Sequence, residues 1–224
     1  MDSRSAQEKA YSFLKERITN STFRPNSRLK ALEIAKELGI SRTPVKEALG
    51  RLEQEGLVKR ELGSGYVVQA LSIREILNLY KVREVLEVEG AKELLQLLTE
   101  DIIHRLDEIL NGAQALLQEK RYDDFLRATL KFHNAMVSAT GNNVLCEILA
   151  GLNARIWSIG TIIVTKYPPR ADEILFENRR ILKALASRNV DDLERSIRAH
   201  IGGAGDSVKR LIEQEPYDLY IASA

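Results

Sequence analysis

Four polar residues interrupt apolar helical stripes in the C-terminal part of the chain. Thr129 and His133 are one helical turn apart, and Asn178 and His200 each lie between apolar residues at helical spacing. Hydroxyl, amide and imidazole groups that face a bundle interior are suited to bind a polar ligand or to contribute to a metal site. A single buried histidine is more often a satisfied core residue, but four such groups favour a cavity.

Arg83 and Glu87 form a second pair of this kind, because they are one turn apart in the sector that also contains Ile76, Tyr80 and Leu94. A buried guanidinium is costly unless a negative charge neutralises it. Glu87 can supply that charge, which makes the pair structural, or Arg83 can bind an anionic ligand. The sequence leaves both interpretations open.

A third group, Arg42, Thr43 and Lys46, shares one face at the beginning of a helical segment near the N-terminus. The adjoining face of the same helix is apolar. Side chains in the first turns of a helix meet base edges and phosphates when the helix enters the major groove of DNA. We therefore expect this face to contact DNA.

The elements around this face have the order of a winged helix-turn-helix. Helices are predicted over residues 6–19 and 31–38, and Gly39 ends the second. Ser41 is the expected N-cap of the third helix, which ends at Gly56. A hairpin with a glycine-rich tip follows and ends near residue 68. Residues 1–70 are thus predicted to form a DNA-binding domain.

The remaining residues, 71–224, show recurring helix signals and no strand alternation. Thr99 and Asp123 are expected N-caps, and Asp191 begins a close variant of a capping box. These signals predict an antiparallel bundle, which makes the whole protein mainly α. The predicted helices cover residues 72–98, 100–119, 123–139, 142–165, 171–187 and 191–213.

Composition and charge agree with two modules. Residues 1–70 carry 13 Lys and Arg against 9 Asp and Glu, whereas the remainder carries 20 against 23, so the N-terminal module is the basic one. The single cysteine, Cys146, excludes an internal disulfide and a Cys-cluster metal site. The N-terminus has no apolar stretch, and no apolar run is long enough to span a bilayer. We expect a cytoplasmic protein that does not interact with membranes.

The segment Ser41-Arg42-Thr43-Pro44-Val45-Lys46-Glu47-Ala48-Leu49, continued by Arg51-Leu52-Glu53-Gln54-Glu55-Gly56-Leu57-Val58, resembles the winged helix-turn-helix of the GntR family of bacterial transcription regulators. The resemblance implies that Arg42, Thr43 and Lys46 touch the operator and that Gly63 or Gly65 of the wing enters the minor groove. Arg51 is a further expected DNA-binding residue. Lys46 replaces the family's usual arginine and Glu61 a basic wing residue, and these departures concern operator sequence and affinity.

Residues 72–213 resemble the FCD effector-binding domain of the FadR subfamily, on Val82-Arg83-Glu84-Val85-Leu86-Glu87 and Phe132-His133-Asn134-Ala135-Met136. Many members hold a divalent metal with one Asp and three His, beside a carboxylate effector. The matching positions here are Thr129, His133, Asn178 and His200. Two of the four ligands are lost, including the anionic one, so we expect no tightly held metal and no other cofactor. Any metal would depend on His133 and His200.

These observations predict a homodimeric transcription regulator, acting as a repressor, that binds a near-palindromic operator in double-stranded DNA. A small carboxylate or acyl-type effector is expected to bind in the helical domain near the following residues: Arg83, Glu87, Thr129, His133, Asn178 and His200. Val82 and Val85, on another side of the same helix, are candidates for the dimer interface. Two alternatives are an all-helical metal-dependent enzyme and a sequence-tolerant architectural DNA-binding protein. The enzyme lacks a carboxylate or nucleophile–base pair in its expected site, and the architectural protein needs a more basic binding module.

Overall fold

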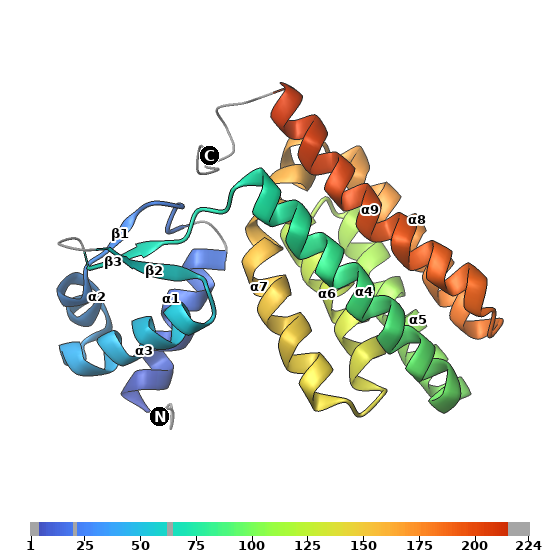
Figure 1. The fold of residues 1–224 in the computed structure, drawn as a ribbon, viewed down its shortest axis with the longest axis horizontal. Coiled ribbons are helices and arrows are strands. Elements are labelled where there is room, and N and C mark those ends of the chain that lie inside the picture. Colours follow the sequence, from blue (N-terminus) through green and yellow to red (C-terminus); the bar gives the residue numbers. More distant parts are fainter. Residues whose placement is uncertain (1–4, 20–21, 62–64, 215–224) are drawn as a thin grey trace. The chain divides into compact units, whose positions relative to one another are not determined.

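The computed structural model describes residues 5–19, 22–61 and 65–214. Contacts divide the chain at the Ile73–Arg74 bond into two compact units, which we call the N-terminal unit and the C-terminal unit. The fold is mainly α, as predicted (Figure 1).

The N-terminal unit is a winged helix-turn-helix. Helix α3 contacts α1, α2 and β2, and its apolar stripe is fully buried. The turn between α2 and α3 has Gly39 in the left-handed conformation, with φ of 66°, which glycine adopts without a Cβ penalty. The elements are α1 (Ala6–Thr19), β1 (Arg28–Leu29), α2 (Ala31–Leu38), α3 (Arg42–Gln54), β2 (Val58–Glu61) and β3 (Gly65–Val68).

The predicted hairpin belongs to a three-stranded antiparallel sheet of order β1-β3-β2. Arg28 pairs with Val67, so the short strand β1 covers the second edge of β3. Strand β1 was not predicted, because a two-residue strand has too few positions for an alternating pattern. Ser41 has the extended backbone of an N-cap but makes no side-chain capping hydrogen bond.

The C-terminal unit is the predicted helical bundle (Figure 1). Contacts join α5 to α6 and α8, α8 to α9, and α7 to α6, α8 and α9. Helices α4 and α7 approach closely at Gly90, where a Cβ would lie only 2.8 Å from Cδ2 of Leu145. The helices are α4 (Ile73–Leu97), α5 (Glu100–Gln118), α6 (Tyr122–Ser138), α7 (Asn143–Lys166), α8 (Pro169–Ala186) and α9 (Val190–Gln214).

Three helix starts test the capping predictions. Thr99 caps α5, because its hydroxyl accepts from the backbone N–H of Ile102 at 3.3 Å. The other two predictions were wrong. Asp123 lies within the first turn of α6, whose N-cap position is Arg121. Asp191 also lies inside its helix, where the side chain of Asn189 accepts from the N–H of Asp192 at 3.0 Å. Acidic residues favour the whole first turn of a helix, so composition located both starts only to within a few residues.

Helix α8 begins earlier than predicted, with Pro169 in its first turn rather than ahead of the helix. Helix α7 is bent. Among the described residues no single helix is long and apolar enough to cross a membrane, and only the two parts of α7, Asn143–Trp157 and Ile159–Lys166, meet that test when taken together.

Candidate nucleic-acid interface and ligand cavity

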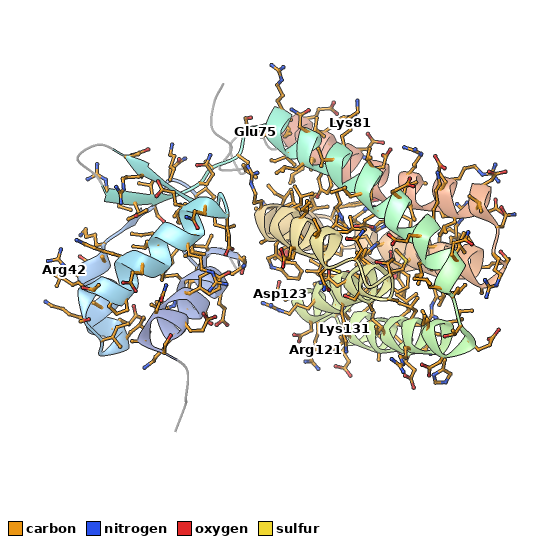
Figure 2. All side chains as sticks on the ribbon, turned by 60° about the horizontal axis from the view of Figure 1, so that its bottom comes forward. Arg42, Glu75, Lys81, Arg121, Asp123 and Lys131 are labelled. Carbon is orange, nitrogen blue, oxygen red and sulfur yellow. The ribbon has the colours of Figure 1, made fainter. Side chains whose placement is uncertain are left out.

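The beginning of α3 presents the predicted DNA-contact residues to solvent. Arg42, Thr43 and Lys46 are all exposed, whereas Val45 and Ala48 between and after them are fully buried. Figure 2 shows the side chain of Arg42 extending away from the body of the N-terminal unit. The helix therefore keeps two separate faces, one that holds the unit together and one that is available to a partner.

An open cleft in the same unit runs between this face and the wing. Arg42 and Lys46 line one side, and Arg60 and Gly65 line the other. Arg60 donates to the hydroxyl of Tyr66 at 2.8 Å, so the wing holds its guanidinium in place. Gly65 has φ of 79°, a conformation that favours glycine. Gly63, the other predicted wing contact, lies outside the described residues.

Arg51 is placed differently from the other predicted DNA contacts. Its guanidinium carbon lies 3.7 Å from the centroid of the Tyr11 ring, and its Nη1 lies 3.1 Å from Oε2 of Glu8 on α1. Lys15 and Tyr11 also reach Glu55, at 2.7 Å each. In the free protein Arg51 thus takes part in a polar and aromatic contact between α1 and α3.

The C-terminal unit contains a partly open cavity of about 100 Å³. Four of the residues predicted to bind an effector, Arg83, Thr129, His133 and His200, line it. Asn178 and Glu87 are buried but do not line the cavity, so its inner layer differs from the predicted set. The lining residues are Tyr80, Arg83, Leu126, Thr129, Leu130, His133, Asn153, Ile156, Trp157, Gly160, Arg170, Ile174, His200 and Ala204.

Arg83 both pairs with Glu87 and lines the cavity, so the structure is compatible with each of the two interpretations of this residue. Its Nε donates to Oε1 of Glu87 at 2.5 Å, and the side chain also lines the cavity. Nδ1 of His133 lies 2.8 Å from the other carboxylate oxygen, Oε2, although the direction of approach is poor for a hydrogen bond. Burial alone raises the pKa of Glu87, but the charge of Arg83 and the contact with His133 outweigh it and hold this pKa well below its usual range.

A second buried ion pair lies behind His200. Arg170 is 2% exposed and binds Glu177 through both terminal nitrogens, at 2.6 and 2.9 Å. Nδ1 of His200 hydrogen-bonds Oε2 of Glu177 at 2.8 Å. Burial lowers the pKa of His200 to about 4 despite this carboxylate. Burial also opposes ionisation of Glu177, but the hydrogen bonds from His200 and Arg170 lower its pKa.

Arg170 and Glu177 were not among the predicted site residues. Their spacing of seven residues, with Glu173 in between, was a usable signal because it puts all three on one face of a helix. Burial of that face depends on α9, whose Gly203 leaves room for the ion pair. A Cβ at this position would lie 2.9 Å from Nη2 of Arg170.

The remaining predicted residues have distinct surroundings. The rings of His133 and His200 stack, with centroids 4.8 Å apart and an interplanar angle of 20°. The hydroxyl of Thr129 donates to the backbone carbonyl of Leu126 at 2.9 Å. Asn178 is fully buried, and neither its amide nitrogen nor its amide oxygen has a partner.

Charge is layered around the cavity. Two guanidinium groups, of Arg83 and Arg170, and two imidazoles reach the inner surface, whereas the carboxylates of Glu87 and Glu177 stand behind them. The carboxylates lower the cost of burying the guanidinium groups without facing the cavity themselves. Arg83 and Arg170 thus supply hydrogen-bond donors to the lining of the cavity, which suits an acid.

A winged helix-turn-helix with a separate all-helical unit defines a DNA-binding protein of the regulator class, and the comparisons identify the family. Residues 6–68 match the model of bacterial regulatory proteins of the gntR family, and residues 78–203 match the FCD domain. The chain belongs to the GntR family of transcriptional regulators and carries a C-terminal FCD domain.

Similar proteins support this assignment. The uncharacterized HTH-type transcriptional regulator YdhC of Bacillus subtilis is 28% identical over 91% of each chain. The HTH-type transcriptional repressor RspR of Escherichia coli is 23% identical over 95% of this chain and 92% of its own. In fold, E. coli McbR/YncC has a TM-score of 0.80 at 20% identity, over 92% of this chain and 98% of its own.

The residues present do not fit the metal site that the family resemblance implies. The cavity lining contains no carboxylate, Asn178 is not part of it, and Thr129 donates its hydroxyl proton to backbone. Within the described ranges no group of three His, Cys, Asp or Glu side chains is placed to hold a metal ion. Two imidazole ligands supply no negative charge to compensate a dication, so zinc and nickel are poorly matched.

Proposed function

We propose that the protein is a one-component transcriptional repressor. A homodimer binds a near-palindromic DNA operator in the cytoplasm, and a small acidic metabolite in the C-terminal cavity controls operator affinity. The exposed face of Arg42, Thr43 and Lys46 carries the proposal, because these side chains lie in the first turns of a helix whose other face is buried, which is where a recognition helix meets DNA. The similarity to RspR, a transcriptional repressor, supports the direction of control.

The cavity supports the second half of the proposal. Arg83 and Arg170, together with His133 and His200, line a space that can hold a small molecule. An effector that binds one conformation of the dimer better than another shifts the population of operator-competent dimers by its differential binding free energy.

Dimerisation is part of the same proposal. A near-palindromic operator requires two copies of α3 related by a two-fold axis. Val82 and Val85 of α4 are 49% and 57% exposed, and Ile148 of α7 is 48% exposed. Apolar side chains of this size on neighbouring helices suit a surface covered by a second copy.

Two experiments test the function. DNase footprinting on the promoter beside the protein's own gene separates a regulator, which protects a discrete two-fold site, from an architectural protein, which protects DNA without preference. A thermal-shift screen of organic acids, sugar acids, amino acids and acyl-CoAs tests the effector, because a ligand at 100 times its Kd stabilises by about 2.7 kcal/mol. Turnover of any ligand found in the screen would favour the metal-dependent enzyme instead.

A further inference from the structure

Leu32 is an exposed apolar side chain at the start of α2. Its exposed fraction is 47%, and among the described residues of the N-terminal unit no other large apolar side chain is exposed. An α-helix turns by about 100° per residue, so Leu32 lies on the far side of α2 from the buried Ile34. Leu32 therefore takes no part in the core of the unit.

The position of Leu32 sets it apart from an ordinary surface leucine. Single exposed apolar residues are common and usually need no explanation. Leu32, however, lines the same open cleft as Arg42 and Lys46, two of the predicted DNA contacts of α3. Helix α2 also contacts α3 directly. A partner that binds Arg42 and Lys46 in this cleft therefore comes within reach of Leu32.

The charges around Leu32 suit DNA as that partner. Four cationic and two acidic side chains line the cleft, namely Lys30, Arg42, Lys46 and Arg60 with Glu47 and Glu61. The excess of cations complements the phosphates of a duplex. Leu32 is the exception among the exposed side chains here, because it can neither pair with a phosphate nor form a hydrogen bond with a base edge.

The chemistry of the major groove leaves one base with an apolar group for a leucine. Base edges present hydrogen-bond donors and acceptors, but thymine also presents its C5 methyl group. Burial of one such group against an apolar side chain raises affinity about fourfold. A leucine beside base-reading cations can therefore distinguish thymine from a base without the methyl group, which a hydrogen-bonding side chain cannot do in this way.

We infer that Leu32 is a specificity residue for the operator and contacts the C5 methyl group of a thymine in each half-site. The inference rests on the proposed operator binding and goes beyond it, because the predicted base contacts of α3, Arg42, Thr43 and Lys46, are all polar. It also gives α2 a part in reading the sequence, whereas the first helix of a helix-turn-helix usually crosses the DNA backbone.

Operator duplexes that lack single methyl groups test this inference. Duplexes that the full-length protein prefers are first selected from a random pool, and each thymine is then replaced by deoxyuridine at the same position of both half-sites. Deoxyuridine pairs with adenine as thymine does and lacks only the methyl group. At one position the wild type should lose about fourfold in affinity per half-site, or about fifteenfold in all. Fluorescence anisotropy at fixed salt measures the affinities.

The variant Leu32→Ala removes the proposed partner of the methyl group. It should bind the unmodified operator about as weakly as the wild type binds the deoxyuridine operator, and it should bind the two duplexes equally well. Its fold should be intact, because the side chain is exposed. Leu97→Ala, on a 49% exposed leucine of α4, is the matched control and keeps the wild-type preference for thymine.

The base 5-methylcytosine separates the methyl group from the base pair. At the sensitive position, a cytosine paired with guanine should bind more weakly than the original thymine. Addition of the methyl group, as 5-methylcytosine, should recover about fourfold per half-site in the wild type and nothing in Leu32→Ala.

Two results would overturn the inference while leaving operator binding in place. In the first, no deoxyuridine substitution changes the affinity of the wild type. In the second, the loss is the same in Leu32→Ala as in the wild type, so that the methyl group acts without Leu32. If the random pool yields no preferred duplex at all, the proposed operator function fails, and the role of Leu32 fails with it.

Discussion

Arg83 pairs with a buried carboxylate and also lines the cavity, so this one position tests a structural role and a ligand-binding role together. Its Nε donates a hydrogen bond to Glu87, and the same side chain lines the cavity. Removing Arg83 alone leaves the buried Glu87 with only His133, which is expected to destabilise the fold by about 3–5 kcal/mol. The role of Arg83 in binding has to be measured with its partner neutralised.

We therefore predict the behaviour of the double variant Arg83→Met/Glu87→Gln. It should stay folded, bind operator without effector as the wild type does, and lose about tenfold or more in effector affinity, since a hydrogen bond to a charged group contributes about 1.5–3 kcal/mol. Calorimetry with the acid found in the screen measures the affinity. Arg198→Met, a surface arginine paired with Glu194, is the control. Unchanged effector affinity would make Arg83–Glu87 a purely structural pair.

His200 gives the stability of the protein a defined pH dependence. The unfolded chain takes up a proton on this imidazole near pH 6.5, but the folded protein does so only near pH 4. Between these values the unfolded state binds more protons than the folded state. The contribution of the neutral His200 to the free energy of unfolding is therefore complete above pH 6.5 and is lost as the pH falls towards 4. Glu177 has a lowered pKa, so its contribution is lost only below about pH 4.5.

Urea unfolding at pH 7 and pH 5 measures this effect. Between these two pH values the free energy of unfolding of the wild type should fall by about 2 kcal/mol more than that of His200→Gln. Each pH unit below 6.5 corresponds to about 1.4 kcal/mol. His104→Gln, which alters an exposed histidine, should behave as the wild type. If His200→Gln lost as much stability as the wild type, the neutral buried imidazole would be the wrong assignment.

The donor set around the two histidines also predicts metal content. After dialysis against EDTA the purified protein should contain well under one zinc or nickel per chain, because no anionic ligand lines the cavity. Elemental analysis gives the ratio. About one metal per chain that disappears in His133→Ala would contradict the prediction.

Among the helices, α9 contains a glycine, Gly203, at the position that packs against the Arg170–Glu177 ion pair. Gly202 and Gly203 are neighbours in the middle of this helix, but only Gly203 lies against Arg170 and Glu177. Glycine in a helix interior costs about 0.5–1 kcal/mol relative to alanine. The two positions therefore provide a matched comparison of helix propensity with packing.

Gly202→Ala should stabilise the protein by about 0.5–1 kcal/mol, since nothing lies within 4 Å of its added Cβ. Gly203→Ala should instead cost about 1–3 kcal/mol, because its Cβ displaces a buried guanidinium that cannot move without losing Glu177. Chemical denaturation of both variants checks the difference. Equal stabilisation by the two substitutions would show that the guanidinium of Arg170 can move away from the new Cβ without losing its contact with Glu177.

For the whole molecule, the proposed operator complex uses two copies of the α3 face. Arg42→Ala should cost roughly 1–3 kcal/mol and weaken discrimination between operator bases, whereas Lys46→Ala should reduce the salt dependence of binding. Both variants should remain folded dimers, because the two side chains are exposed and make no core contact. Fluorescence anisotropy at several salt concentrations separates the two effects.

The control for this prediction is Lys131→Ala, an exposed lysine of α6 in the C-terminal unit (Figure 2). It should leave operator affinity unchanged. Unaltered affinity in the double variant Arg42→Ala/Lys46→Ala would remove α3 from the DNA interface.

The sequence by itself determined the order of elements and the face of α3. Helical periodicity is local, and the buried stripe beginning at Val45 follows from residues within one helix, so the exposed position of Arg42 and Lys46 was predictable. The helix boundaries were predictable only approximately, as Asp123 and Asp191 show, because several acidic residues compete for the same first turn.

Only the tertiary structure decided which polar residues meet. The pairing of Arg170 and Glu177 with His200 joins α8 to α9, and the approach of Glu87 to His133 joins α4 to α6. A helical pattern specifies which face of each helix is buried, but not the rotation and depth at which two helices pack. Those are set by side-chain volumes across the interface, such as the space left at Gly203, and they exclude Asn178 from the cavity while leaving His200 on its wall.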